Sequence, residues 1–239
     1  MTIMIFDSGN RFLVVAAHPD DEVLGIGGVL SIARQVKIPV CVQFLGEGVS
    51  ARFSKDEFHG PEFIEAHSRR QSGAKRALLE LGVQKTVYEG NFCCRFDGLE
   101  IIELVKKIEL LIEEFKPTHI FTHNPVEVNI DHRIVYRAVE TATRPKSTST
   151  VLGVYSFEIP CSGSWAFDDC FKPNVFVDIS EVWEKKLAAW ACYEGEERAF
   201  PFPRSVTGLE TLARYRGMQS GLLMAEGLRS LRQIIPKIG

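Results

Sequence analysis

The feature that most constrains the fold of this chain is a regular alternation between short β-rich runs and longer helical runs. Residues 11–17 (RFLVVAA) and 39–45 (PVCVQFL) have the continuous apolar character of strands that are buried on both faces. Residues 22–35 between them fit a helix, and a strand–helix–strand order favours a parallel sheet covered by helices. We therefore predict an α/β fold in one domain over residues 1–239.

The rest of the chain continues this alternation. The clearest helix is 99–115, because its apolar residues recur at the i, i+3, i+4, i+7 spacing of one buried face. Further helices are predicted over 61–81, 131–143, 181–193 and 207–232, and further strands over 86–88, 118–122, 151–157 and 174–178. Three long stretches fit neither pattern, and we expect them to fold over a functional site: 46–60, 158–173 and 194–206.

Charge and hydropathy exclude two classes of partner. The chain has 28 Lys and Arg against 31 Asp and Glu, and a net charge of −3 lacks the basic excess that nucleic-acid binding needs. No apolar run approaches the roughly 20 residues that span a bilayer. The first residues also lack the basic start and cleavage site of a signal peptide. We therefore expect a cytoplasmic protein with no nucleic-acid or membrane partner.

Residues with reactive side chains follow two of the predicted strands. The first strand runs into His18-Pro19-Asp20-Asp21, and the fourth is followed by His123 and then by Asn129, Asp131 and His132. In a right-handed α/β sheet the first and fourth strands commonly lie side by side, and ligands bind beyond their carboxyl ends. We therefore expect these two segments to face each other across one cleft.

Two imidazoles and a carboxylate that meet in this way can form a three-ligand zinc site. His18, Asp21 and His132 supply the ligand types, and the fourth position stays open for water. Such a metal lowers the pKa of bound water toward about 7, and Asp20 is left to act as general base. The alternative stays open that the acidic residues only favour the positive end of a helix dipole, and that Asp131 is a helix N-cap.

The motifs AHPDDE (residues 17–22) and NIDHRIV (residues 129–135) resemble those of the LmbE-like, or PIG-L, family of zinc-dependent N-acetyl-sugar deacetylases. Later segments are also similar to bacterial members: 144–145, 156–165, 171–180 and 213–219. The resemblance implies a Rossmann-like fold, with helices on both faces of a mostly parallel sheet and long loops over the site. It also implies Zn²⁺, or another divalent metal, on His18, Asp21 and His132, with Asp20 as general base. Members often form higher oligomers, which leaves a homo-oligomer open.

One position departs from the family pattern in the second motif. Members commonly have a histidine two residues before the Asp of that motif, where this chain has Asn129. An amide donates a hydrogen bond to an oxyanion but delivers no proton at neutral pH. We therefore expect Asp20 to return the proton to the leaving amine, or His123 to deliver it. Asp131 is expected to accept an N–H from a ligand imidazole and to fix its tautomer.

Four further residues are predicted to contact the substrate. Arg70 is what remains of the family's R-x-x-E pattern, with Gly73 in place of the Glu, and is assigned to hydroxyl or phosphate contacts. Its alternative role is that of a solvated arginine on a helix face. Glu47, with Arg52 following, stands where many members have Asp-Gly, and we expect it to orient a metal ligand or a sugar hydroxyl. Trp165 is assigned to a rim that stacks on a sugar face, or else to a hydrophobic lid.

These observations predict a metal-dependent N-deacetylase, a hydrolase of linear amides. Its substrate would be a small molecule, an N-acetylglucosamine-type amino sugar or its conjugate. One alternative is a related amidase for a non-sugar or thiol-conjugate amide, and another is a non-catalytic binding protein of the same fold. A dinucleotide site is not predicted, because Gly25-Ile26-Gly27-Gly28 lacks the G-x-G-x-x-G spacing and falls inside a helix, where close packing is its expected purpose.

Overall fold

The elements follow the predicted alternation along the chain. The structure, a computed structural model, describes residues 5–167 and 169–235. Its strands are β1 (Phe12–Ala16), β2 (Val40–Gly46), β3 (Lys85–Asn91), β4 (His119–Thr122), β5 (Gly153–Phe157), β6 (Val175–Asp178) and β7 (Ala225–Gln233). Its α-helices are α1 (Asp21–Gln35), α2 (Pro61–Leu81), α3 (Ile101–Phe115), α4 (Ile130–Ala142), α5 (Trp183–Ala191) and α6 (Val206–Met218). Short 3₁₀ turns lie between them: η1 (Ser50–Arg52), η2 (Lys55–Glu57), η3 (Phe96–Gly98) and η4 (Ser180–Val182).

Strand β1 lies in the interior of the sheet between β2 and β4, and all five of its residues are apolar and buried. The strand order is β3-β2-β1-β4-β5-β7-β6, so the order reverses between β1 and β4. Strand β1 pairs in parallel with both β2 and β4, and Val15 aligns with Thr122. The predicted adjacency of the first and fourth strands is therefore confirmed, and the segments that follow them leave the sheet at the same edge.

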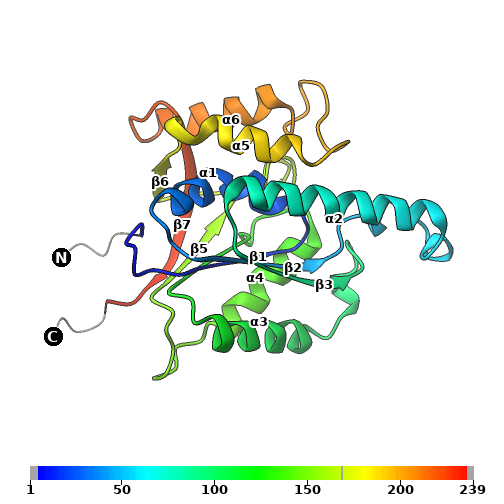
Figure 1. Cartoon of the computed structure of the whole chain (residues 1–239), viewed down its shortest axis with the longest axis horizontal. Helices are drawn as coiled ribbons and strands as arrows, with labels where there is room; N and C mark the ends of the chain where they lie inside the picture. The colour runs from blue at the N-terminus through cyan, green and yellow to red at the C-terminus, as the bar shows by residue number, and fades with distance from the viewer. Residues whose placement is uncertain (1–4, 168, 236–239) are drawn as a thin grey trace.

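Helices cover both faces of the sheet, with α1, α2, α5 and α6 on one face and α3 and α4 on the other (Figure 1). Alternate residues of a strand point to opposite faces. Phe12 and Val14 of β1 therefore enter the core under α1 and α2, while Leu13 and Val15 enter the core under α3 and α4. The predicted α/β fold, with a mostly parallel sheet between two helical layers, is confirmed.

Local sequence signals are found where the structure needs them. Pro61 begins α2, where its missing N–H costs no hydrogen bond, and Gly82 ends the helix in the left-handed conformation at φ 71°. In α1, a Cβ atom at Gly25 would lie 2.4 Å from the ring of Phe157. The glycines of α1 therefore permit close packing, as the sequence predicts.

The C-terminal part of the chain differs from the prediction of one helix over 207–232. Helix α6 ends at Met218, and β7 runs antiparallel between β5 and β6. Gly217 allows this change of direction, because a Cβ atom there would lie 2.5 Å from the carbonyl oxygen of Leu222. Ala225 and Leu228 are then buried in the sheet. Pairing with β5 and β6 thus overrides a sequence whose residues also suit a helix.

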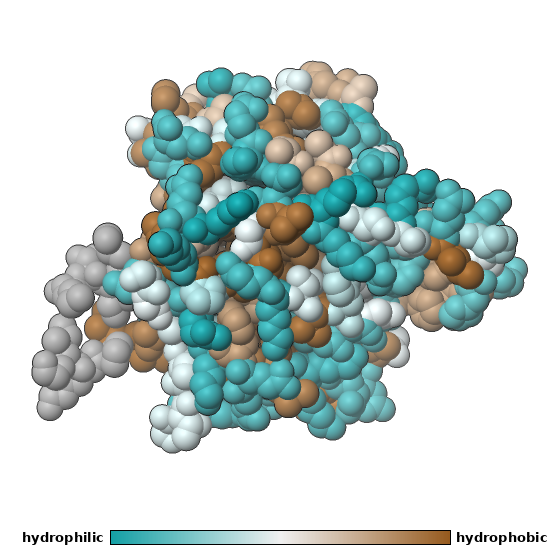
Figure 2. Space-filling view, viewed as in Figure 1, coloured by the Kyte–Doolittle hydropathy of each residue, from teal (hydrophilic) through white to brown (hydrophobic). Residues whose placement is uncertain are grey.

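The face of the molecule shown in Figure 2 is mostly hydrophilic over the outer surfaces of α2 and α3, with apolar side chains gathered in a few patches. Helix α2 projects from the body of the molecule at its N-terminal end (Figure 1). Among the described residues, none of the helices combines the length and the apolar character that crossing a bilayer requires.

Candidate metal centre and active site

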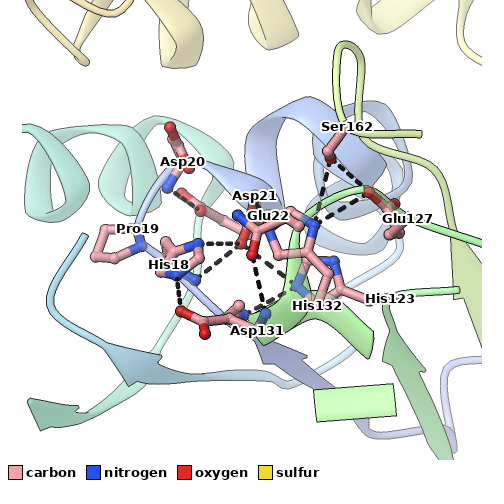
Figure 3. A network of polar contacts seen from close by, with 12 residues as sticks. His18, Pro19, Asp20, Asp21, Glu22, His123, Glu127, Asp131, His132 and Ser162 are labelled. Atoms are coloured by element: carbon pink, nitrogen blue, oxygen red, sulfur yellow. Dashed lines mark hydrogen bonds and ion pairs between the residues drawn. The ribbon is translucent and has the colours of Figure 1, made fainter. Parts of the chain in front are cut away.

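The site lies beyond the carboxyl ends of β1 and β4, where two distant segments of the chain meet (Figure 3). His18 follows β1 after a single residue, and Asp21 is the first residue of α1. Asp131 and His132 lie in the first turn of α4. All four side chains are buried. The structure thus brings the two segments together at one edge of the sheet.

Three of these side chains form a group with the composition and spacing of a metal site. His18, Asp21 and His132 each offer one ligand atom, and these atoms lie within 4.8 Å of one another. Asp21 Oδ1 lies 3.5 Å from His132 Nε2, and Asp21 Oδ2 lies 3.6 Å from His18 Nδ1. Within the described residues, the buried atoms Asp21 Oδ1 and His132 Nε2 have no hydrogen-bond partner. Unpaired buried polar atoms are costly, so a divalent cation fits this group.

Asp131 orients His18 through the other ring nitrogen. Asp131 Oδ2 lies 2.8 Å from His18 Nε2 and also accepts a hydrogen bond from the backbone N–H of Cys94, while Oδ1 accepts one from Phe96 at 3.0 Å. His18 therefore donates its Nε2–H to Asp131 and keeps Nδ1 toward Asp21. Burial lowers the pKa of His18, but the Asp131 hydrogen bond and the Asp21 charge outweigh it and raise the pKa to about 9.

His132 is oriented by Glu127, a residue that the sequence analysis missed. Glu127 Oε2 lies 3.2 Å from His132 Nδ1. The same oxygen accepts a hydrogen bond from the Ser162 hydroxyl at 2.5 Å, and Asn124 donates to the other carboxylate oxygen at 2.9 Å. Each histidine of the group is therefore held by a carboxylate on the ring nitrogen that does not face Asp21.

A second group of ligand atoms shares His132. His123, Glu127 and His132 also place their ligand atoms within 4.8 Å of one another. Both oxygens of Glu127 already accept hydrogen bonds, and His123 Nε2 accepts one from the backbone N–H of Ala17 at 2.9 Å. Asp21, in contrast, keeps one oxygen without a partner in the described part of the chain. The first group is therefore better suited to a cation.

His123 is enclosed behind His132. Its exposed fraction is 0%, and its ring stacks on the His132 ring with 4.0 Å between centroids. Burial and the neighbouring His132 lower the pKa of His123 to about 4. Its Nε2 lies 3.3 Å from Asp21 Oδ2. This placement supports Asp21 and His132 from behind, and it favours Asp20 over His123 as the group that protonates the leaving amine.

Asp20 has an unusual backbone conformation that its neighbours hold in place. Its φ of 131° lies outside the range that non-glycine residues ordinarily adopt. The Asp20 N–H donates to Glu22 Oε2 at 3.0 Å, and the Tyr193 hydroxyl donates to Glu22 Oε1 at 2.5 Å. Burial raises the pKa of Glu22 to about 8. Strained backbone persists where the surroundings enforce it, and it is common at functional sites.

Two arginines from distant elements meet at the Asp20 carboxylate. Arg70 of α2 donates to Asp20 Oδ2 at 2.9 Å, and Arg204, just before α6, donates to the same oxygen at 3.1 Å. Arg70 also donates to the carbonyl oxygen of Pro19 at 2.7 Å and pairs with Glu196. It is 6% exposed, so the alternative of a solvated arginine on a helix face is wrong. The stretch that carries Glu196 and Arg204 therefore folds over the site.

The other predicted substrate residues lie nearer the surface. Arg52 pairs with Glu196 at 2.7 Å, and its side chain is 54% exposed. Arg52 and Arg70 line one cavity of about 140 Å³. Trp165 is 53% exposed and packs edge-on against Phe202, with 6.2 Å between ring centroids. The cavity is thus lined by charged groups, and Trp165 and Phe202 are not among its lining residues.

Two predicted site residues support the local backbone. Asn129 is the N-cap of α4, because its side chain accepts a hydrogen bond from the Asp131 N–H at 2.9 Å. The N-cap is therefore not Asp131. Glu47 accepts hydrogen bonds from the backbone N–H groups of Val49 at 2.6 Å and Cys93 at 2.9 Å. These bonds turn Glu47 toward its own loop, in place of the predicted contact with a metal ligand or a sugar hydroxyl.

Comparisons with known proteins find relatives along most of the chain. The family model described as PIG-L, GlcNAc-PI de-N-acetylase, matches residues 13–143. The diacetylchitobiose deacetylase of Thermococcus kodakarensis is 30% identical over 94% of this chain and 84% of its own length. The 4-oxalmesaconate hydratase of Pseudomonas putida is 26% identical over 92% of this chain and 88% of its own. The crystal structure of GalB, the 4-carboxy-2-hydroxymuconate hydratase of Pseudomonas putida KT2440, has a TM-score of 0.76 at 19% identity and covers 96% of this chain and 99% of its own.

Proposed function

This chain belongs to the PIG-L family, and we propose that it is a metal-dependent hydrolase that removes the acetyl group from an N-acetylated amino sugar. One observation carries the proposal: in the buried group of His18, Asp21 and His132, the atoms Asp21 Oδ1 and His132 Nε2 have no hydrogen-bond partner among the described residues, and the group lies beside the acidic turn that holds Asp20. The relative with 30% identity is a diacetylchitobiose deacetylase, which favours an N-acetylglucosamine-type sugar or its conjugate as the substrate.

We assign His18, Asp21 and His132 as ligands of a divalent metal, with zinc as the first metal to test, because Zn²⁺ favours imidazole and carboxylate ligands. When bound, such a metal lowers the pKa of water and polarises the amide carbonyl. Asp131 and Glu127 hold the two imidazoles through their other ring nitrogens. Each ring then keeps one tautomer and one direction, so the ligand atoms stay aimed at the same point.

Asp20 acts as the general base that takes a proton from the attacking water. The departing amine then needs a proton. Asn129 has none to give at neutral pH, and His123 is enclosed behind His132. Asp20 therefore returns the proton that it took. We assign the amide nitrogen of Asn129, which lies 4.0 Å from Cys94 Sγ, to donate a hydrogen bond to the oxyanion, because the amide oxygen caps α4.

The substrate's sugar is assigned to the side of the site where Arg52 and Arg70 line a cavity. Arg70 has a double role there, because it also holds the Asp20 carboxylate. Trp165 is exposed beside Phe202, and its ring face is available to stack on a sugar. Charged side chains in the cavity suit the hydroxyl groups of a sugar, so these residues support an amino-sugar substrate.

The proposal is tested by acetate release from N-acetylglucosamine, diacetylchitobiose and an N-acetylglucosamine glycoside. We expect release that a chelator abolishes and that added zinc restores. The Asp20→Asn variant should bind metal normally and lose about 10²–10⁴-fold in rate, the usual contribution of a general base. Unchanged release by this variant would refute the assignment of the base. A protein that binds one metal ion and releases no acetate from any sugar would refute deacetylation.

The relative from Pseudomonas putida favours a second candidate function, the hydration of 4-oxalmesaconate. Both reactions add water, so the same ligand group and the same base serve either one. The two are separated by incubating the metal-loaded protein with 4-oxalmesaconate and following its consumption. Consumption of this compound without acetate release from any sugar would replace deacetylation by hydration.

A further inference from the structure

Arg204 reaches the proposed base from the stretch between α5 and α6. Its Nη1 lies 3.1 Å from Asp20 Oδ2. Its Nε lies 3.5 Å from the carbonyl oxygen of Pro160, so the guanidinium bridges Asp20 and the stretch that follows β5. The side chain of Arg204 is 19% exposed. Arg204 is thus a largely enclosed cation in direct contact with the proposed general base.

The two arginines on Asp20 differ in how firmly they are held. Arg70 donates to the carbonyl oxygen of Pro19, pairs with both Asp20 and Glu196, and has a side chain that is 5% exposed. Among the ion pairs of residues 5–167 and 169–235, Arg204 has Asp20 as its single carboxylate partner. Arg70 is therefore fixed by three groups, two of which are carboxylates, whereas Arg204 is held by one carboxylate together with the weaker partners Pro160 and Cys161.

Proton transfer to Asp20 changes the charge balance around these arginines. A carboxylic acid is neutral, so Arg204 loses its directly paired carboxylate at this step and is left with the more distant charges of Asp21 and Glu196, while Arg70 keeps its direct pair with Glu196. In the same step the attack of water on the amide carbon moves negative charge onto the carbonyl oxygen. A cation and a new anion attract each other strongly in a site from which water is largely excluded.

We propose that Arg204 is a catalytic residue that exchanges partners: it pairs with Asp20 before the attack and donates to the amide oxygen once Asp20 is protonated. This inference rests on the proposed deacetylation. An O–H bond of water breaks and its proton goes to Asp20, a C–O bond forms, and the π pair moves to the oxygen that Arg204 contacts. Asp20 then protonates the nitrogen, the C–N bond breaks with its electron pair on nitrogen, and the carbonyl re-forms. Acetic acid, which then ionises, and the free amine leave, and Arg204 returns to Asp20.

The test compares Arg204→Gln, Arg204→Ala and Arg204→Lys in kcat and KM, on a sugar that the wild-type protein deacetylates. The matched control is Arg214→Gln, which removes an exposed arginine of α6 that pairs with Glu210. We expect kcat to fall by about 10²–10³-fold in the Gln and Ala variants, the usual cost of losing one oxyanion donor. The Lys variant should lose less, because it keeps the charge. Metal content and KM should change little, and the control should match the wild type.

Added guanidinium ion should restore part of the kcat of Arg204→Ala and none of the kcat of Asp20→Asn, because only the first variant lacks a guanidinium. Equal losses in the Lys and Gln variants, a change confined to KM, an unchanged kcat or the absence of rescue would each overturn the exchange of partners. If Arg204→Ala does not fold, the difference in kcat between Arg204→Lys and Arg204→Gln tests the proposal. A wild-type protein that binds metal and releases no acetate would instead refute deacetylation, so the two failures are distinguishable.

Discussion

Strand β4 has a buried histidine at each of its ends, and the two have different surroundings. His119 begins the strand, is 2% exposed, and lies between the rings of Phe12 and Tyr155. Its Nδ1 is 2.9 Å from the hydroxyl of Thr118. His123 follows the strand, is 0% exposed, and contacts the carboxylate of Asp21 at 3.3 Å. Burial lowers the pKa of each imidazole to about 4.

The difference between the two ends of β4 shows that burial alone does not make a histidine functional. Within residues 5–167 and 169–235, His119 belongs to no group of potential metal ligands, whereas the surroundings of His123 contain Asp21 and the ring of His132. His18 lies in the same cluster, and there the carboxylates raise the pKa to about 9 in spite of burial. The carboxylates gathered at the carboxyl ends of β1 and β4 are therefore what distinguishes the proposed metal cluster from a packed core.

The largest expected effect tests this comparison directly. His132→Ala should abolish both metal binding and acetate release, because it removes a ligand atom from a three-residue group. His119→Leu should retain both, because His119 belongs to the core. Metal content per chain, measured after dialysis against zinc and removal of free ion, distinguishes the two. Equal metal content in the two variants would show that His132 has no larger part in metal binding than His119.

The next effect concerns the carboxylates that orient the imidazoles. Asp131→Asn and Glu127→Gln should each weaken metal affinity by about 10–100-fold, because the ligand ring loses its fixed tautomer and direction. Competition with a chromogenic chelator measures this affinity. Glu113→Gln, on the exposed side of α3, is the matched control for the loss of one carboxylate. A wild-type affinity in either site variant would show that its carboxylate serves only the fold.

A smaller effect on catalysis is expected at Asn129. Its proposed role is to donate one hydrogen bond from a neutral amide, and it holds no metal. Asn129→Ala should lower kcat by about 100-fold and should also destabilise the protein by about 1 kcal/mol through the loss of the helix cap. Asn129→Ser keeps a capping oxygen but lacks the amide donor. If Asn129→Ser has the wild-type kcat, the residue is an N-cap and takes no part in catalysis.

The smallest effect is on stability at the aromatic end of β4. The pKa of His119 is about 4 in the folded protein and about 6.5 when unfolded, so the unfolded chain binds a proton first as the pH falls. The contribution of neutral His119 is fully present above about pH 6.5 and is lost progressively toward pH 4. Between pH 7.5 and 5.5 the wild-type free energy of unfolding should therefore fall by about 1 kcal/mol more than that of His119→Leu. Urea unfolding of both proteins at the two pH values measures this difference, and parallel curves would contradict it.

The fold shows which sequence signals act locally. Helix α2 has the predicted bounds, because Pro61 and Gly82 set the backbone conformation at its two ends. Strand β1 is equally clear, because a run of five buried apolar residues suits the centre of a sheet. The predicted helix over 207–232 is wrong in its second half, because Leu228 and its neighbours suit either a helix or a strand. Pairing with β5 and β6 makes this segment a strand, and no local sequence pattern predicts that pairing.

The sequence by itself determined the alternation of strands and helices and placed His18, Asp21 and His132 after two strands that were expected to be neighbours. Only the tertiary structure decided which residues surround them: Glu127 with Ser162, Glu22 with Tyr193, and the two arginines on Asp20. The physical reason is distance along the chain. A helix or strand depends on residues a few positions apart, whereas the Arg204–Asp20 contact joins residues 184 positions apart and exists only once the long loops have folded back over the sheet.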